Sequence, residues 1–154
     1  LDFHPRYHAK ERCYLYRIYS TPNRDPLRER YTWRIWPPLD MERLQAASQD
    51  FLGVHDFQAF GSPHESGGST IREIWSAAWR QDQDDYRFEI RGNAFLYHMV
   101  RHIVEVLVTI GQEREPIDTV KQLLQNPSGP PAQGLAPAQG LVLKDVVYID
   151  SEDS

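Results

Sequence analysis

Residues 95–110 read FLYHMVRHIVEVLVTI and form the most apolar segment of the chain. The polar side chains of this segment recur every three or four residues, at His98, Arg101, His102, Glu105 and Thr109. In an α-helix this spacing gathers them on one narrow stripe. Because apolar side chains cover the rest of the circumference, we expect a helix over 95–110, ended by Gly111, at the buried centre of the domain.

Arg101 is the unusual residue of that stripe. A guanidinium group cannot escape burial by losing its proton, and an unpaired buried cation is costly. In one interpretation Arg101 forms a structural ion pair, with Glu105 one turn along or with Asp56 in a turn expected over 54–57. In the other it orients and ionises a catalytic carboxylate, whose pKa a neighbouring cation lowers by about 1–3 units.

Two further interpretations concern metal binding and nucleophilic catalysis. His98 and His102 are four residues apart and, with Glu105 as a third ligand, would suit a metal-dependent hydrolase. The Arg101 cation on the same stripe argues against a metal, so no metal site is predicted. Cys13 is expected to be a small packed side chain rather than a nucleophile, because no histidine lies near it in the local sequence.

Five strands and two more helices are expected outside this segment. The strands cover 12–19, 31–36, 70–79, 86–91 and 141–149, and the helices cover 41–51 and 116–125. Asp40 is the expected N-cap of the first of these helices, and the strands over 70–79 and 86–91 are expected to pair as a hairpin. This order predicts an α+β fold with a mostly antiparallel sheet and helices packed on one face.

Composition limits the class of protein. The chain has 154 residues, 40% hydrophobic and 12% aromatic, which predicts one globular domain over 1–149 followed by an acidic tail at 150–154. A single cysteine excludes a disulfide framework and suits the cytoplasm. No stretch reaches the ~20 apolar residues of a membrane span, so we expect a soluble protein. The absence of an initiator methionine leads us to expect that the sequence begins inside a longer protein.

Charge is distributed unevenly along the chain. The net charge of −5 argues against a nucleic-acid partner, but residues 1–34 carry eight basic and four acidic groups and the other 120 residues have a net charge of −9. Guanidinium groups bind phosphates and aromatic rings stack on unpaired bases. The arginine- and tyrosine-rich start therefore indicates RNA contact, although a solvated charged face is the alternative. The candidate phosphate contacts are Arg6, Lys10, Arg12 and Arg17.

Six segments, read together, resemble the TruA-type tRNA pseudouridine synthases. They are FHPRY at 3–7, YLYRIY at 14–19, LGVHDFQAF at 52–60, TIREI at 70–74, FEIRGNAFLYHMVR at 88–101 and QGLVL at 139–143. The resemblance implies the catalytic subdomain of that fold. It also implies isomerisation of uridine to pseudouridine in the tRNA anticodon stem-loop, by an aspartate nucleophile and without a cofactor, in an enzyme that is often a homodimer.

The resemblance assigns two catalytic residues in this chain. Tyr14 aligns with the tyrosine that stacks on the target base and assists proton transfer, and Arg101 aligns with the arginine that pairs with the catalytic aspartate. Glu105 stands where the family commonly has a small residue, so it is a possible internal partner for Arg101.

The family's nucleophile lies in a GRTDAG motif that does not occur in this sequence. We therefore expect a C-terminal portion of such an enzyme, inactive alone, whose partners are tRNA and the missing N-terminal half. The alternative is a non-catalytic RNA-binding or dimerisation module of the same fold.

Overall fold

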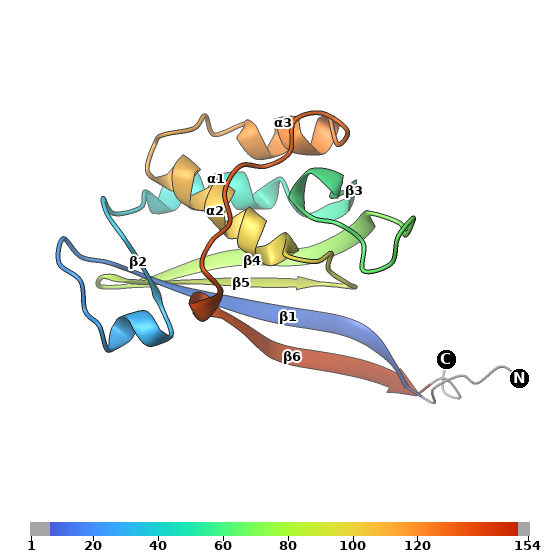
Figure 1. Ribbon diagram of the computed structural model, residues 1–154, viewed down its shortest axis with the longest axis horizontal. Helices are drawn as coiled ribbons and strands as arrows, with labels where there is room; N and C mark the ends of the chain where they lie inside the picture. Colours follow the sequence, from blue (N-terminus) through green and yellow to red (C-terminus); the bar gives the residue numbers. More distant parts are fainter. Residues whose placement is uncertain (1–6, 151–154) are drawn as a thin grey trace, which may run out of the picture.

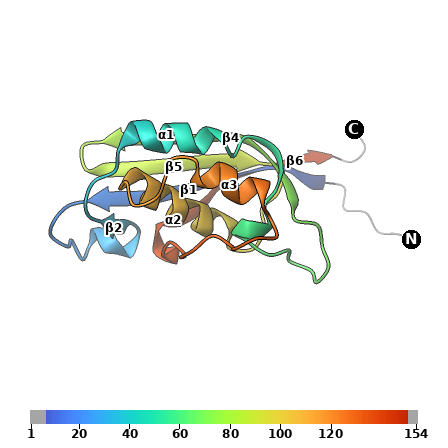
Figure 2. The same ribbon diagram turned by 90° about the horizontal axis from the view of Figure 1, so that it is seen from above.

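A six-stranded sheet forms one layer of the molecule and three α-helices form the other. The computed structural model describes the backbone of residues 7–150 and the side chains of residues 11–147. In Figure 1 all three helices lie above the sheet, and Figure 2 shows them from above, in front of it. The predicted α+β class, with helices on one face of a mostly antiparallel sheet, is confirmed.

Strand β1 (Tyr7–Ser20) is the spine of the sheet. On one side it pairs along 12–19 with β5 (Asp85–Gly92), which continues the sheet through β4 (Ile71–Asp82) to β3 (Gly53–Asp56). On its other side it pairs first with β6 (Leu141–Asp150) and then, over its last three residues, with the short strand β2 (Trp33–Ile35). Every pairing is antiparallel except that of β1 with β2.

Four of the predicted strands are longer than expected and one is shorter. The segment 12–19 extends to Tyr7 and Ser20, and the expected hairpin forms between β4 and β5, joined by a tight turn at Gln83 and Asp84. The aromatic run over 31–36 contributes only the three residues of β2. The predicted turn over 54–57 was wrong, because residues 53–56 form β3. A strand of four residues is too short to show a recognisable alternation of apolar and polar side chains. It forms because its backbone pairs with β4.

The helices are shorter than the sequence suggested. The first, α1 (Met41–Gln49), ends before Phe51, and α3 (Thr119–Gln125) begins after Pro116. The central helix α2 (Met99–Gly111) begins four residues later than predicted, because His98 is left-handed at φ 63° and cannot continue a helix. As expected, α2 is central: its apolar side chains pack on the sheet and form much of the core.

The start of α1 meets the end of α2. The Asp40 carboxylate accepts hydrogen bonds from the backbone N–H groups of Glu42 (3.0 Å) and Arg43 (3.3 Å), as an N-cap does. The Asp40 N–H in turn donates to the Gly111 carbonyl at 2.9 Å. A side chain at Gly111 would meet Leu44 at 2.9 Å, so glycine allows the two helices to approach this closely.

Replacing Asp40 by Ala is expected to lower the free energy of unfolding by about 1 kcal/mol, because two helix N–H groups lose their acceptor. Asp40→Asn keeps an acceptor oxygen and is expected to lose much less. Urea unfolding of the two variants measures the difference. Equal losses in both would contradict a capping role.

Candidate functional site

A small hollow opens where β1, the start of α2 and the start of β6 meet. Its volume is about 190 Å³, and it is lined by Tyr14, Phe95, Leu96, His98, Met99, Val100, Arg101, Ala138 and Leu141. Larger hollows exist between α1 and β4 and between α1 and α3, but neither contains both an aromatic ring and an arginine. The structure thus brings the two residues singled out in the sequence, Tyr14 and Arg101, into one hollow.

Tyr14 enters the hollow from the helix-covered face of β1. Its ring packs edge-on against Phe95, with ring centroids 5.0 Å apart. The side chain is half-buried, and its hydroxyl makes no hydrogen bond to any residue that the structure describes. The ring is therefore held in place by packing while the hydroxyl stays available for another partner.

Arg101 is anchored at one nitrogen. Its Nε donates to the Ala136 carbonyl at 2.7 Å, and the Ala136 N–H donates back to the Arg101 carbonyl at 3.2 Å. The two terminal nitrogens have no hydrogen-bond partner among the described residues. The bond at Nε therefore fixes the direction of a guanidinium group whose bidentate end remains unused.

Neither structural ion pair considered for Arg101 forms. Within the described part of the chain, no carboxylate lies within ion-pair distance of Arg101. Asp56 accepts hydrogen bonds from Thr70 Oγ1 (2.6 Å) and the Gln58 N–H (3.0 Å) instead. Burial raises the pKa of Glu105, and the cations that partly oppose this are Arg114 and His102 rather than Arg101.

The loop that anchors Arg101 is the proline- and glycine-rich segment 126–140. Figure 1 shows this segment, in orange to red, crossing α2 before it enters β6. Along α2 the Gly134 carbonyl lies 2.8 Å from His102 Nδ1, and closer to β1 the Tyr16 hydroxyl donates to the Pro137 carbonyl. These contacts cover part of the polar stripe of α2, so the loop determines which of its side chains reach the hollow.

The sequence of this loop contains a repeat whose role was not apparent from the sequence alone. The segment PAQGL occurs twice, from Pro131 and from Pro137. Each copy puts its glycine against a side chain of another element: a Cβ at Gly134 would lie 2.6 Å from Glu105 Cγ on α2, and one at Gly140 would lie 2.7 Å from the Tyr16 ring on β1. Both glycines are therefore required by close approach.

His98 lies at the rim of the hollow and does not build a metal site. Its ring stacks on Tyr97 with centroids 3.8 Å apart, while the His98 and His102 centroids are 6.5 Å apart. Burial, with the nearby charges of Arg101 and His102, lowers the pKa of His98, so its imidazole is neutral at pH 7. Within residues 11–147, no three His, Cys, Asp or Glu side chains are grouped so that they could hold a metal ion.

Cys13 is buried on the other face of the sheet from the hollow, since it alternates with Tyr14 along β1. Burial raises the pKa of its thiol, which keeps it protonated. It is a packed side chain in the structure, as the sequence suggested, and it does not approach the candidate site.

Of the four basic residues proposed as phosphate contacts, the structure describes the side chains of Arg12 and Arg17. Arg6 lies outside the described residues, as does the side chain of Lys10. Arg12 and Arg17 lie on opposite faces of β1, because an odd number of positions separates them and their pairing with β5 is regular. Neither Arg12 nor Arg17 lines the hollow.

Comparison with known proteins supplies a family. The family model described as tRNA pseudouridine synthase matches residues 47–149. A protein named tRNA pseudouridine synthase A from Limosilactobacillus fermentum is 38% identical over 149 residues, which cover 96% of this chain and 58% of the relative. Its namesake from Myxococcus xanthus is 38% identical over 97% of this chain and 57% of the relative. The chain thus spans a little over half the length of these relatives.

Membrane insertion by a helix is not supported by the fold. Among residues 7–150, no helix combines the length and the apolar character that a crossing needs.

Replacing Glu105 by Gln is expected to raise the free energy of unfolding at neutral pH, because burial disfavours the carboxylate. A carboxyl whose pKa is higher in the folded state loses stability as the pH rises above its ordinary value of 4.5. Well below that pH both side chains are neutral, and the difference should vanish. Urea unfolding across this pH range measures it, and a less stable Gln variant at neutral pH would mean that neighbouring cations stabilise the Glu105 carboxylate more than burial disfavours it.

Proposed function

Because the chain belongs to the tRNA pseudouridine synthase family, we propose that it is the C-terminal part of an enzyme that isomerises uridine to pseudouridine in the anticodon stem-loop of tRNA. One observation carries the proposal. Arg101 is fixed at Nε, lines the same hollow as Tyr14, and has no acidic partner in the described part of the chain. A carboxylate supplied by the missing N-terminal half would complete the site.

Tyr14 is the proposed contact for the target base. The uridine must leave its stack to be reached, which costs a few kcal/mol. Stacking on an aromatic ring offsets about 1–3 kcal/mol of that cost. The packing of Tyr14 against Phe95 presents the ring in a fixed orientation, so little conformational entropy is lost when the base arrives. The free hydroxyl is placed to take part in proton transfer.

Arg101 is the proposed partner of the nucleophile. During the reaction an aspartate bonds to the sugar carbon as the bond from that carbon to the base nitrogen breaks. The base then turns, and its carbon bonds to the sugar as the aspartate leaves as a carboxylate. The base carbon loses its proton and the freed nitrogen gains one, so the product is an isomer of the substrate. A guanidinium beside the aspartate keeps it ionised and aimed, and the bond from Nε to Ala136 fixes the orientation of the planar group, whose two terminal nitrogens are left for bidentate pairing.

The chain alone is proposed to be inactive, because the nucleophile belongs to the other half. The whole enzyme is proposed to be a cytoplasmic homodimer that needs no cofactor. Mixing this chain with the separately produced N-terminal half should restore isomerisation of uridine in tRNA. A mixture that forms a complex but stays inactive would favour the alternative, a non-catalytic RNA-binding or dimerisation module.

Replacing Arg101 by Ala in the complete enzyme is expected to lower kcat by about 10²–10³-fold, as removal of a preorganised charged donor does. The pKa of the nucleophilic carboxylate should rise by about 1–3 units, so the low-pH limb of the rate profile should move to higher pH. Pseudouridine formation measured across a pH series gives both quantities.

Arg43 offers a matched control for this change. Arg43 lies on α1, and its Nε also donates to a backbone carbonyl, that of Ile110 at 2.8 Å. This contact is at the end of α2 that is far from the hollow. Arg43→Ala should leave the pH profile unmoved. If Arg101→Ala leaves the pH profile unmoved as well, the proposed pairing of Arg101 with the nucleophile is refuted.

Replacing Tyr14 by Phe separates stacking from the hydroxyl. Tyr14→Phe is expected to bind tRNA as the wild type does and to lower kcat, because only the hydroxyl is lost. Tyr14→Ala should also weaken binding, by about 1–3 kcal/mol, as the stacking surface disappears. Steady-state kinetics and tRNA binding distinguish the two, and full activity of the Phe variant would exclude the hydroxyl from proton transfer.

A further inference from the structure

Three arginines lie directly opposite one another on three neighbouring strands. Arg17 on β1 pairs in register with Arg87 on β5, which pairs with Arg80 on β4. All three point away from the helices, because the residues beside them, including Tyr16, Ile18, Phe88 and Trp79, belong to the core. Like charges opposite one another destabilise a sheet, so this arginine row is not explained by folding.

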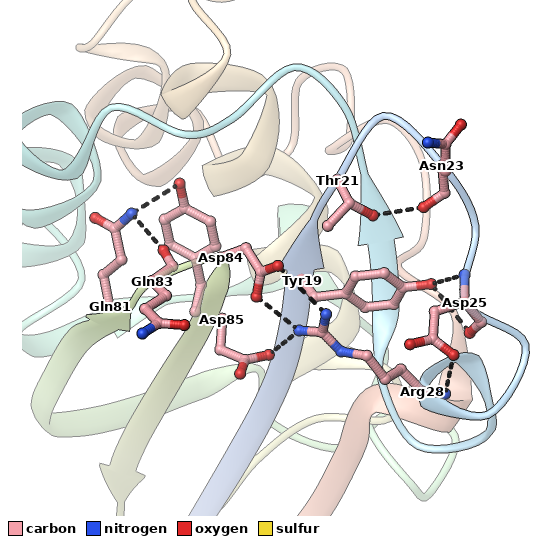
Figure 3. A network of polar contacts seen from close by, with 10 residues as sticks. Tyr19, Thr21, Asn23, Asp25, Arg28, Gln81, Gln83, Asp84 and Asp85 are labelled. Carbon is pink, nitrogen blue, oxygen red and sulfur yellow. Dashed lines mark hydrogen bonds and ion pairs between the residues drawn. The ribbon is translucent and has the colours of Figure 1, made fainter.

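Three other cations near the arginine row form ion pairs. Arg91 binds Glu11 at 2.7 Å, and Lys144 binds Glu89 at 2.5 Å. At the hairpin end Arg28 binds Asp84 at 2.9 Å and Asp85 at 2.5 Å, and Figure 3 shows it reaching both carboxylates. The carboxylates of Glu11, Glu89, Asp84 and Asp85 are thus engaged by other cations, and Asp82 is the neighbouring carboxylate without an ion pair among the described residues.

The arginine row itself is unpaired. Among the described side chains, no carboxylate lies within ion-pair distance of Arg17, Arg80 or Arg87, and none of the three donates a hydrogen bond. Arg17 Nε is buried without any hydrogen-bond partner. Arg80 and Arg87 are exposed and line a hollow of about 270 Å³ on this face. The fold therefore lines up the exposed Arg80 and Arg87 with the half-buried Arg17, and none of the three has an ion-pair partner among the described residues.

An aromatic side chain shares the face. A bulge in β4 leaves both Trp75 and Ser76 between the inward-facing Ile74 and Ala77, so Trp75 projects on the helix-free side and is 40% exposed. A strand rises about 3.3 Å per residue, which puts Trp75 within about 17 Å of Arg80 along the strand. Cations in a line with an exposed ring suit a sugar–phosphate backbone with accessible bases.

We propose that the arginine row binds the phosphodiester backbone of tRNA at a place distant from the reacting nucleotide, an inference that rests on the proposed function. Neighbouring strands put the backbones that carry the three arginines about 5 Å apart, and the fork of each guanidinium group matches a phosphate bidentately. Bound phosphates would also cancel the repulsion within the row. The hollow lined by Tyr14 and Arg101 lies on the helix-covered face, so the row is a separate contact.

Asp82 gives the proposal a test of opposite sign. It lies two positions after Arg80 on β4, on the same face, and forms no ion pair with any described residue. A carboxylate there repels a phosphate that approaches the row. Asp82→Asn should therefore tighten tRNA binding.

The test uses the complete enzyme carrying Arg17→Gln, Arg80→Gln and Arg87→Gln together. Binding to tRNA measured over a range of salt should show the slope of log K against log salt falling by about 2–3, since each phosphate contact contributes about 0.7–0.9. kcat/KM should fall because KM rises, and not because kcat changes. The melting temperature should rise, because the repulsion within the row is removed, and this separates lost binding from lost folding.

The matched control changes the same charge elsewhere. Arg30→Gln, Arg114→Gln and Lys121→Gln together remove three exposed cations that form no ion pair among the described residues, and the wild-type slope is expected. The proposal is overturned if the triple row variant keeps the wild-type salt slope, or if the control variant lowers the slope by as much. It is also overturned if the row variant binds tRNA normally but associates poorly with the N-terminal half, because the row would then be a protein interface.

The variant Arg101→Ala distinguishes this inference from the proposed function. If that variant keeps full activity, the proposed function fails whatever the row does. If it is inactive while the row variant binds tRNA with the wild-type slope, only the present inference fails.

Discussion

The hydrogen bond from Arg101 Nε to the Ala136 carbonyl is the contact on which the candidate site depends. It joins the central helix to the loop that precedes the last strand, two segments 35 residues apart in the sequence. A half-buried guanidinium would otherwise move towards solvent or towards Glu105. Because one backbone carbonyl satisfies Nε and no described carboxylate takes the terminal nitrogens, the group keeps both its direction and its charge. With its direction fixed and its terminal nitrogens free of described carboxylates, Arg101 is a candidate partner for a carboxylate from outside this chain.

The two faces of the sheet divide the functions proposed here. Alternation along β1 sends Tyr14 and Tyr16 towards the helices and Arg17 away from them. The helix-covered face buries its aromatic side chains and keeps one hollow beside Arg101. The open face has few apolar groups to bury and instead carries ion pairs around the unpaired arginine row. One strand thus contributes to a proposed catalytic pocket on one side and to a proposed phosphate contact on the other.

Local patterns in the sequence were informative where a segment is long or has a distinctive end. The clean alternation of 86–91, the Asp40 cap and the apolar wall of α2 all predicted elements that the structure contains. Patterns failed at short or irregular segments: β3 has four residues and depends on β4 for its existence, and the left-handed His98 delays the start of α2. Periodicity describes the inside of an element, whereas its ends depend on contacts with other segments.

The resemblance of six segments pointed to the family and to Tyr14. Residue types and their order predicted the fold class and singled out Arg101, because burial and charge constrain which side chains a helix or strand can carry. They left open whether Arg101 pairs with Glu105, with Asp56 or with neither. That question depends on distances between segments remote in the chain, and the loop over 126–140 answers it by covering one side of α2. The arginine row is likewise invisible in the sequence, since strand register alone brings residues 17, 80 and 87 together.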